Sequence, residues 1–127
     1  MGGFGVAKNL SSFASDGAAY DVDPMIRSLI EDAYAAGKAM GFMCIAPILA
    51  AATLGSKNIT LTIGKDRETA AKIEAQGAQH KTCDAQSIIV DQTNKIVTTP
   101  AYMEAENLLQ TETGINKLVE SLLKLCQ

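Results

Sequence analysis

Apolar side chains recur at helical spacing directly after the Asp23-Pro24 pair. Asp can accept hydrogen bonds from the free amides of a first helical turn, and Pro fits the first helical position because no N–H partner is needed there. Gly37 closes the segment, as glycine often does after a helix. The pattern predicts an amphipathic helix that covers a sheet with the face formed by Met25, Ile26, Leu29, Ile30 and Ala33.

A short apolar run and a second helical segment follow, and a cysteine separates them. Residues 39–43 (AMGFM) have the length and composition of a strand that is buried on both faces. The segment after Cys44, IAPILAAATLG, is rich in Ala and Leu and ends at Gly55, which is typical of a helix. The chain is therefore predicted to turn directly from a strand into a helix at Cys44.

The rest of the chain continues this alternation. NITLTI (58–63) is rich in β-formers, and DRETAAKIEAQ (66–76) has acids and Thr at its start, as helices do. SIIVD (87–91) and KIVTT (95–99) flank a QTN turn and predict a hairpin, and the tail from Tyr102 carries a helical apolar stripe. Strands that alternate with helices predict one α/β domain, with a mostly parallel sheet and a local β-hairpin.

Composition narrows the classes of partner. The formal net charge of −3 offers no basic surplus for a phosphate backbone, so nucleic acid is not an expected partner. The most apolar region, residues 39–52, is interrupted by Gly41 and Pro47 and is shorter than the roughly 18 apolar residues of a membrane span. No membrane partner and no secretory signal are therefore expected.

The chain has an odd number of cysteines, and they are widely spaced with no CxxC pair: Cys44, Cys83 and Cys126. This usage fits a reducing compartment better than a disulfide framework. We therefore expect a cytoplasmic protein.

Cys44 has two interpretations. A nucleophile at a sharp strand-to-helix turn is exposed to the free amides and the positive dipole end of the helix, which favour a thiolate. A free cysteine, however, is also among the most buried residue types and often only fills space. Both interpretations stay open from the local pattern.

Near the chain start, GGFG (2–5) supplies glycines whose amides can approach an oxyanion closely. Gly2 and Gly3 are thus candidates for an oxyanion site, although a glycine cluster at a chain end is a weak signal. Lys8 and Asn9 follow this loop and are candidate pocket residues for a carbonyl or carboxylate group, with an exposed helix start as the alternative. Thr99 ends a strand on the side where α/β proteins place ligands, so it is a further substrate-binding candidate.

These stretches together resemble a known family. The family is that of the ElbB isoprenoid-biosynthesis glyoxalases, within the PfpI-like, class I amidotransferase-like superfamily. Four stretches are similar to its motifs: GGFGVAKNLSSFA (2–14), GFMCIAP (41–47), LTIGKD (61–66) and NKIVTTPAYM (94–103). The resemblance implies one such domain over residues 1–127, with a flavodoxin-like three-layer sandwich. It also implies Cys44 as the catalytic nucleophile, Gly2, Gly3 and the amide of Ile45 near the oxyanion, and cofactor-free conversion of a small 2-oxoaldehyde to a 2-hydroxy acid.

The sequence departs from the family pattern in two places. The family domain extends further on its N-terminal side, where the resemblance implies the first strands and a glutamate partner for the cysteine. We therefore expect either a homo-oligomer or a requirement for a complementary N-terminal segment. Ile45 stands where PfpI-like proteases have a histidine, so a Cys-His-Glu triad is disfavoured.

His80 is the single histidine of the chain. It lies on the approach to a short strand, and we interpret it as a surface or strand-edge residue. The His80/Cys83 pair offers too few ligands for a structural metal site. No metal or cofactor is therefore predicted. The alternative to glyoxalase chemistry on a small carbonyl substrate is an inactive amidotransferase-like binding or regulatory protein, or a redox sensor that uses Cys44.

Overall fold

Two parallel strand pairs and one hairpin form the β-structure. The computed structural model describes residues 11–12, 20–104 and 106–126. In this part of the chain β1 (Met40–Met43) pairs in parallel with β5 (Ile96–Thr99), and β5 pairs antiparallel with β4 (Ile89–Asp91). A second parallel pair joins β2 (Thr60–Leu61) to β3 (Gln79–His80). The predicted α/β class, with mostly parallel strands and a local hairpin, is confirmed.

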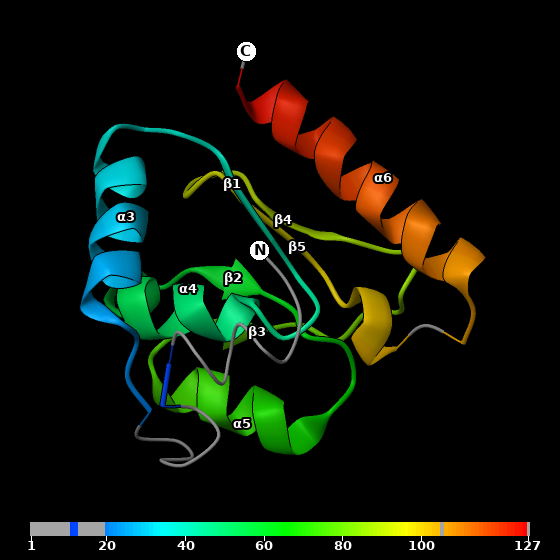
Figure 1. Ribbon diagram of the computed structural model, residues 1–127, viewed down its shortest axis with the longest axis horizontal. Helices are drawn as coiled ribbons and strands as arrows, with labels where there is room; N and C mark the ends of the chain where they lie inside the picture. Colours follow the sequence, from blue (N-terminus) through cyan, green and yellow to red (C-terminus); the bar gives the residue numbers. More distant parts are fainter. Residues whose placement is uncertain (1–10, 13–19, 105, 127) are drawn as a thin grey trace.

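Helices cover both faces of β1. Successive residues of a strand point to opposite sides, so neighbouring residues of β1 contact different helices. Phe42 points into the core shared with α3 (Pro24–Ala35) and α4 (Pro47–Leu54), next to which α5 (Arg67–Ala75) packs. Gly41 faces the other way, toward α6 (Leu108–Leu125). Figure 1 shows α3 and α6 on opposite sides of β1. This is the expected three-layer sandwich.

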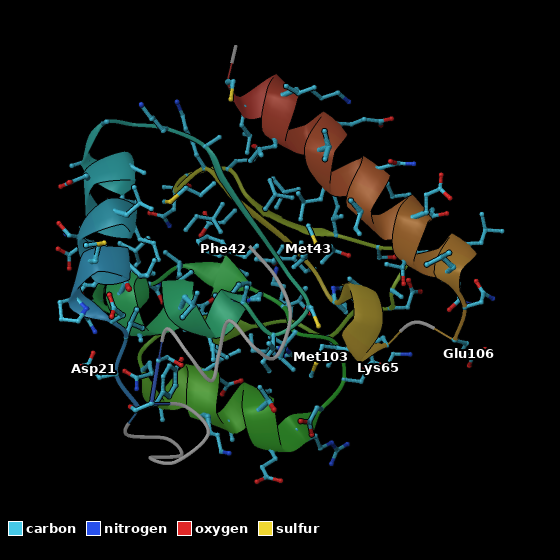
Figure 2. The ribbon with its side chains drawn as sticks, viewed as in Figure 1. Asp21, Phe42, Met43, Lys65, Met103 and Glu106 are labelled. Carbon is cyan, nitrogen blue, oxygen red and sulfur yellow. The ribbon has the colours of Figure 1, made fainter. Side chains whose placement is uncertain are left out.

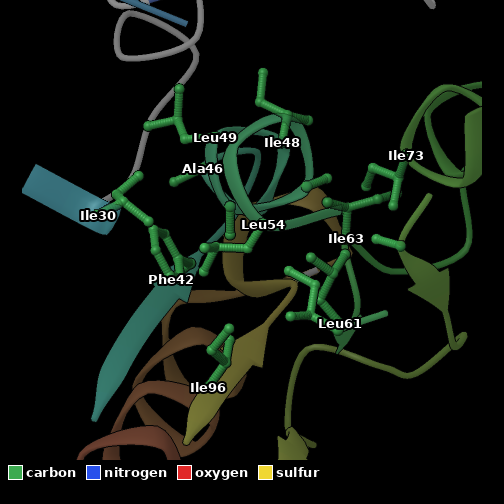
Figure 3. Close-up of a cluster of buried hydrophobic side chains, with 14 of the residues drawn as sticks. Ile30, Phe42, Ala46, Ile48, Leu49, Leu54, Leu61, Ile63, Ile73 and Ile96 are labelled. Carbon is green, nitrogen blue, oxygen red and sulfur yellow. The ribbon is translucent and has the colours of Figure 1, made fainter. Parts of the chain in front are cut away.

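The core lies between the sheet and the α3–α4–α5 layer (Figure 3). α4 is apolar on almost every side, and seven of its eight residues are buried, so it forms the centre of the core rather than a surface layer. Four further apolar side chains from β2, its flanking residues and β5 join this cluster and are fully buried: Ile59, Leu61, Ile63 and Ile96. Burial of this cluster fixes the position of α4 and thereby the turn that precedes it.

The strand predicted over 58–63 is reduced to Thr60 and Leu61 in β2. After Leu61 the backbone N–H groups donate to side chains and not to the backbone of a neighbouring strand. The Thr62 N–H donates to Thr98 Oγ1 at 3.0 Å, and the Ile63 N–H donates to His80 Nε2 at 3.2 Å. These bonds satisfy the backbone without a ladder and tie β2 to β5 and β3.

The terminal helix starts later than the sequence pattern indicated. A 3-10 turn (Ala101–Met103) precedes it, and Asn107 caps α6 by accepting a hydrogen bond from the Gln110 N–H at 2.9 Å. Gly114 lies inside α6, where a Cβ would come within 2.0 Å of the Ala85 carbonyl oxygen. This glycine therefore permits close packing of the helix and does not end it. None of the helices in the described ranges has both the length and the apolar character to cross a bilayer.

Candidate functional site

Cys44 occupies the turn between β1 and α4, as the sequence predicted. Its φ of +61° is in the left-handed region, which non-glycine residues rarely adopt. The Cys44 N–H donates to the Thr99 carbonyl oxygen at 3.0 Å, so the turn is fixed to the end of β5. A strained backbone at a strand-to-helix turn is the geometry of a nucleophile elbow.

The amides of this turn are not equivalent. The Ala46 N–H donates to the Met43 carbonyl at 3.1 Å, the Ile48 N–H donates to the Ile45 carbonyl at 3.2 Å, and Pro47 has no N–H. The Ile45 N–H, by contrast, has no acceptor within the described ranges. The residue after an elbow nucleophile is the one whose amide supplies an oxyanion hole. The free donor is therefore at the expected position.

The Cys44 side chain is less accessible than a displayed nucleophile. The residue is 8% exposed, and its sulfur makes no hydrogen bond to any described residue. Ile45 is 3% exposed, and Ala46 is fully buried. The turn has elbow geometry, but little of the Cys44 residue is exposed.

Thr99 accepts a hydrogen bond from the Cys44 turn through its backbone carbonyl. Its hydroxyl donates to the Ser87 carbonyl at 2.8 Å and lies beside Gly114 of α6, and the residue is fully buried. These contacts make Thr99 a positioning residue for the turn. The other predicted binding residues, Gly2, Gly3, Lys8 and Asn9, lie outside the described residues.

His80 lies on β3, where its Nε2 accepts the Ile63 N–H. The acceptor atom carries no proton, so the ring is neutral with its proton on Nδ1. Burial lowers the pKa of His80 below its usual 6.5, and the Glu74 carboxylate opposes this shift. The imidazole serves the sheet and not Cys44, in agreement with its interpretation as a strand-edge residue. No group of three or more His, Cys, Asp or Glu side chains in the described ranges is placed to hold a metal ion.

Sequence reasoning missed a polar cluster at the carboxyl ends of β2 and β5. Glu104 Oε1 accepts the Lys65 N–H at 2.6 Å, and the Glu104 side chain lies over Gly64, which has a φ of +108°. Lys65 and Glu104 line a polar cavity of about 190 Å³ together with Asp84, Ala85, Gln86, Glu106 and Gln110. Figure 2 shows Lys65, Met103 and Glu106 at this end of the sheet. The glycine after NITLTI is the one sequence signal that marked the loop.

Cys83 lies beside the same cluster. Burial raises the pKa of its thiol, the carboxylates of Asp84 and Glu104 raise it further, and a hydrogen bond with Thr62 opposes the shift. A thiol with a raised pKa is less reactive, because the thiolate is the nucleophile. Cys83 is therefore a poor nucleophile.

Comparisons with known proteins agree on one group of relatives. The chain is 40% identical over 133 residues to the human mitochondrial glutamine amidotransferase-like class 1 domain-containing protein 3, and 38% identical to the rat mitochondrial ES1 protein homolog. Each alignment covers 98% of this chain and 49% of the relative. No protein-family model matches the sequence.

A solved structure has the same arrangement. It is an isoprenoid biosynthesis protein with an amidotransferase-like domain from Ehrlichia chaffeensis, with a TM-score of 0.88 and 29% identity. The match covers 99% of this chain and 57% of that one. This chain thus spans about half the length of its relatives, and the resemblance to amidotransferase-like isoprenoid proteins is confirmed.

The predicted cytoplasmic location is wrong. The human, rat and zebrafish relatives are all named as mitochondrial proteins, which contradicts the prediction. The prediction rested on cysteine usage, which reports a reducing environment but cannot identify the organelle.

Replacement of Cys44 by Gly or by Ala tests the backbone of the elbow. Both variants remove the sulfur, but only Ala keeps a Cβ in the left-handed region. We expect Cys44→Gly to be more stable than Cys44→Ala by about 1 kcal/mol, because a Cβ is unfavourable there. Urea unfolding of both variants measures the difference. A more stable Ala variant would contradict the positive φ.

The shifted pKa of His80 predicts a pH-dependent stability. The unfolded chain, with the usual pKa of 6.5, binds a proton more readily than the folded chain, whose pKa is lower. The free energy of unfolding should therefore be highest above pH 6.5 and fall as the pH drops through the folded-state pKa. His80→Gln keeps an acceptor for the Ile63 N–H and removes the titration. We expect a smaller loss of stability in this variant between about pH 7.5 and pH 5, and an equal loss in both proteins would refute the assignment.

Proposed function

The chain is a homologue of the glutamine amidotransferase-like class 1 domain proteins, over about half of their length, and we propose that it takes part in glyoxalase-type chemistry. The substrate class is a small 2-oxoaldehyde such as glyoxal or methylglyoxal, and the product is the corresponding 2-hydroxy acid. The Ehrlichia relative is described as an isoprenoid biosynthesis protein, and we extend that association to this chain.

The strained Cys44 turn, with the free Ile45 amide next to it, is the observation that carries the proposal. In the first step the Cys44 thiolate adds to the aldehyde carbon, and the carbonyl oxygen becomes an alkoxide. The Ile45 N–H is the donor for this oxygen, and removal of one such donor costs roughly 3–4 kcal/mol in acyl-transfer enzymes. Protonation of the alkoxide gives a hemithioacetal.

The later steps need a base and a water molecule. A base removes the proton from the former aldehyde carbon to give an enediolate, and a proton added to the neighbouring carbon leaves a thioester on Cys44. Water then hydrolyses the thioester, which releases the 2-hydroxy acid and regenerates the thiol. The net reaction adds one water to the substrate and needs no external oxidant or reductant. No carboxylate or imidazole among the described residues hydrogen-bonds to the Cys44 sulfur, so the proposal assigns the base to no described residue.

An inactive binding or regulatory protein is the second candidate, and two observations favour it. The Cys44 residue is 8% exposed, and its sulfur has no proton-transfer partner among the residues described. A scaffold that keeps the elbow but lacks the partner groups would bind a carbonyl compound without turning it over.

Turnover of glyoxal by the full chain separates these functions. We expect glycolate to form with the wild type and to fall to the uncatalysed level in Cys44→Ala, because the nucleophile is lost. Cys83→Ala is the matched control and should keep wild-type turnover, since its thiol has a raised pKa. Glycolate release measured by nuclear magnetic resonance is the readout.

An inert wild-type chain, or a Cys44→Ala variant with undiminished turnover, would contradict the proposed catalysis. Competition for iodoacetamide then tests the second candidate. An inactive scaffold with a buried sulfur should be alkylated at the exposed Cys126 before Cys44, whereas an activated elbow thiol should react first despite its burial.

A further inference from the structure

A polar groove lies between α5 and β3, and the chemistry proposed for Cys44 does not use it. α5 joins β2 to β3 and packs beside β3 (Figure 1). The groove has a volume of about 590 Å³, and residues of α5, of β3 and of the segment after β3 line it: Arg67, Ala70, Ala71, Glu74, His80, Lys81 and Thr82. The alanines have no side chain beyond Cβ, so the polar groups of the other residues determine what this groove can bind.

The two cations of the groove have no carboxylate partner in the described part of the chain. Neither Arg67 nor Lys81 forms an ion pair or a side-chain hydrogen bond with any residue there. The acids beside Arg67 have partners on α5 itself, because Asp66 Oδ2 accepts from the Thr69 hydroxyl at 2.6 Å and Glu68 pairs with the next turn. The whole chain has a formal net charge of −3, so two unpaired cations in one groove are a local positive surplus that attracts an anion.

The direction of α5 places the charged groups at two ends of the groove. β2 and β3 are parallel, so the helix that connects them runs back in the opposite direction. The last turn of α5, with Glu74, is therefore near the start of β3, and the electrostatic interaction between Glu74 and His80 agrees with this placement. Arg67 begins α5 at the other end, toward which the chain continues from His80 through Lys81 to Thr82.

The Arg67 end of the groove is rich in hydrogen-bond donors. It offers the Arg67 guanidinium, the Lys81 ammonium and the Thr82 hydroxyl. The Thr82 backbone N–H is a further donor, since it has no acceptor among the residues that the structure describes. A carboxylate has two oxygens, whereas a phosphate monoester has three acceptor oxygens and a larger negative charge. The donor set therefore suits a phosphate better than a carboxylate.

The Glu74 end offers one acceptor and one donor. Glu74 supplies a carboxylate. His80 Nε2 accepts the Ile63 N–H, so the neutral ring keeps its Nδ1–H as a donor. A hydroxyl group both donates and accepts, and it therefore matches this pair. His80 and Thr82 are two residues apart in a nearly extended segment, roughly 7 Å, which is the length of a short phosphate ester such as glycerol phosphate.

We propose that the groove between α5 and β3 binds a small phosphate monoester that carries a hydroxyl group. Arg67, Lys81 and Thr82 hold the phosphate, and Glu74 and His80 hold the hydroxyl. The Glu74 carboxylate repels a second anion, so it orients the ligand and disfavours inorganic phosphate across the whole groove. This site does not depend on the chemistry proposed for Cys44.

Titration of the isotope-labelled full chain with glycerol phosphate, followed by nuclear magnetic resonance, tests the proposal. We expect amide shifts confined to residues 67–74 and 80–82, and an affinity roughly tenfold above that of inorganic phosphate, because the hydroxyl adds a second anchor. Glycerol, which lacks the anion, should shift none of these amides. Glu74→Gln keeps an acceptor but removes the charge, so it should strengthen the binding of inorganic phosphate and reduce the preference for glycerol phosphate.

Arg67→Gln should weaken the binding of glycerol phosphate by roughly tenfold or more, because it removes a charge-assisted bond to the phosphate. Lys38→Gln is the matched control, since it removes the same charge from an exposed residue outside the groove and should change the affinity by less than about twofold. Both residues are exposed, so neither variant should perturb the fold.

Three results would overturn the proposal. The first is the absence of groove shifts at up to about 10 mM glycerol phosphate. The second is equal affinity for glycerol phosphate and inorganic phosphate in the wild type, because the hydroxyl would then have no site. The third is equal weakening by Arg67→Gln and Lys38→Gln, because attraction to the overall charge would then explain the binding.

Discussion

The hydrogen bond from the Cys44 N–H to the Thr99 carbonyl determines the geometry of the candidate site. It ends the parallel pairing of β1 with β5 and holds Cys44 at a positive φ. The next residues then enter α4, whose apolar side chains are buried on nearly every side. Because α4 cannot move without exposing the core, the turn is constrained from both directions, and the local strain is balanced by packing.

The same constraint explains why one amide of the turn stays free. Ala46 and Ile48 donate to carbonyls inside the turn, and Pro47 has no donor, so the helix start presents only the Ile45 N–H. Thr99 supports this arrangement through its backbone, while its hydroxyl joins β5 to the Ser87 carbonyl beside α6. The chemistry proposed for Cys44 thus depends on β1, because Cys44 directly follows this strand.

Much of this organisation is readable from the sequence, because it depends on local patterns. Three elements follow from neighbouring residues alone. The Asp23-Pro24 cap begins α3, the apolar run before Cys44 forms β1, and the QTN turn joins β4 to β5. The extent of β2 and the role of His80 were not readable, since both depend on side chains that meet backbone groups from distant segments. The Glu104 contact with Lys65 was missed for the same reason, and the sequence left the burial of Cys44 open as one of two interpretations.

A crystal structure of the full chain after reaction with glyoxal tests the central claim most directly, namely that the Cys44 turn binds a carbonyl carbon and its oxygen. We expect continuous density from Cys44 Sγ to a two-carbon adduct, with the adduct oxygen about 2.7–3.1 Å from the Ile45 nitrogen. An unmodified Cys44 with adducts only on exposed groups such as Cys126, or a Cys44 adduct whose oxygen points away from the Ile45 N–H, would contradict it.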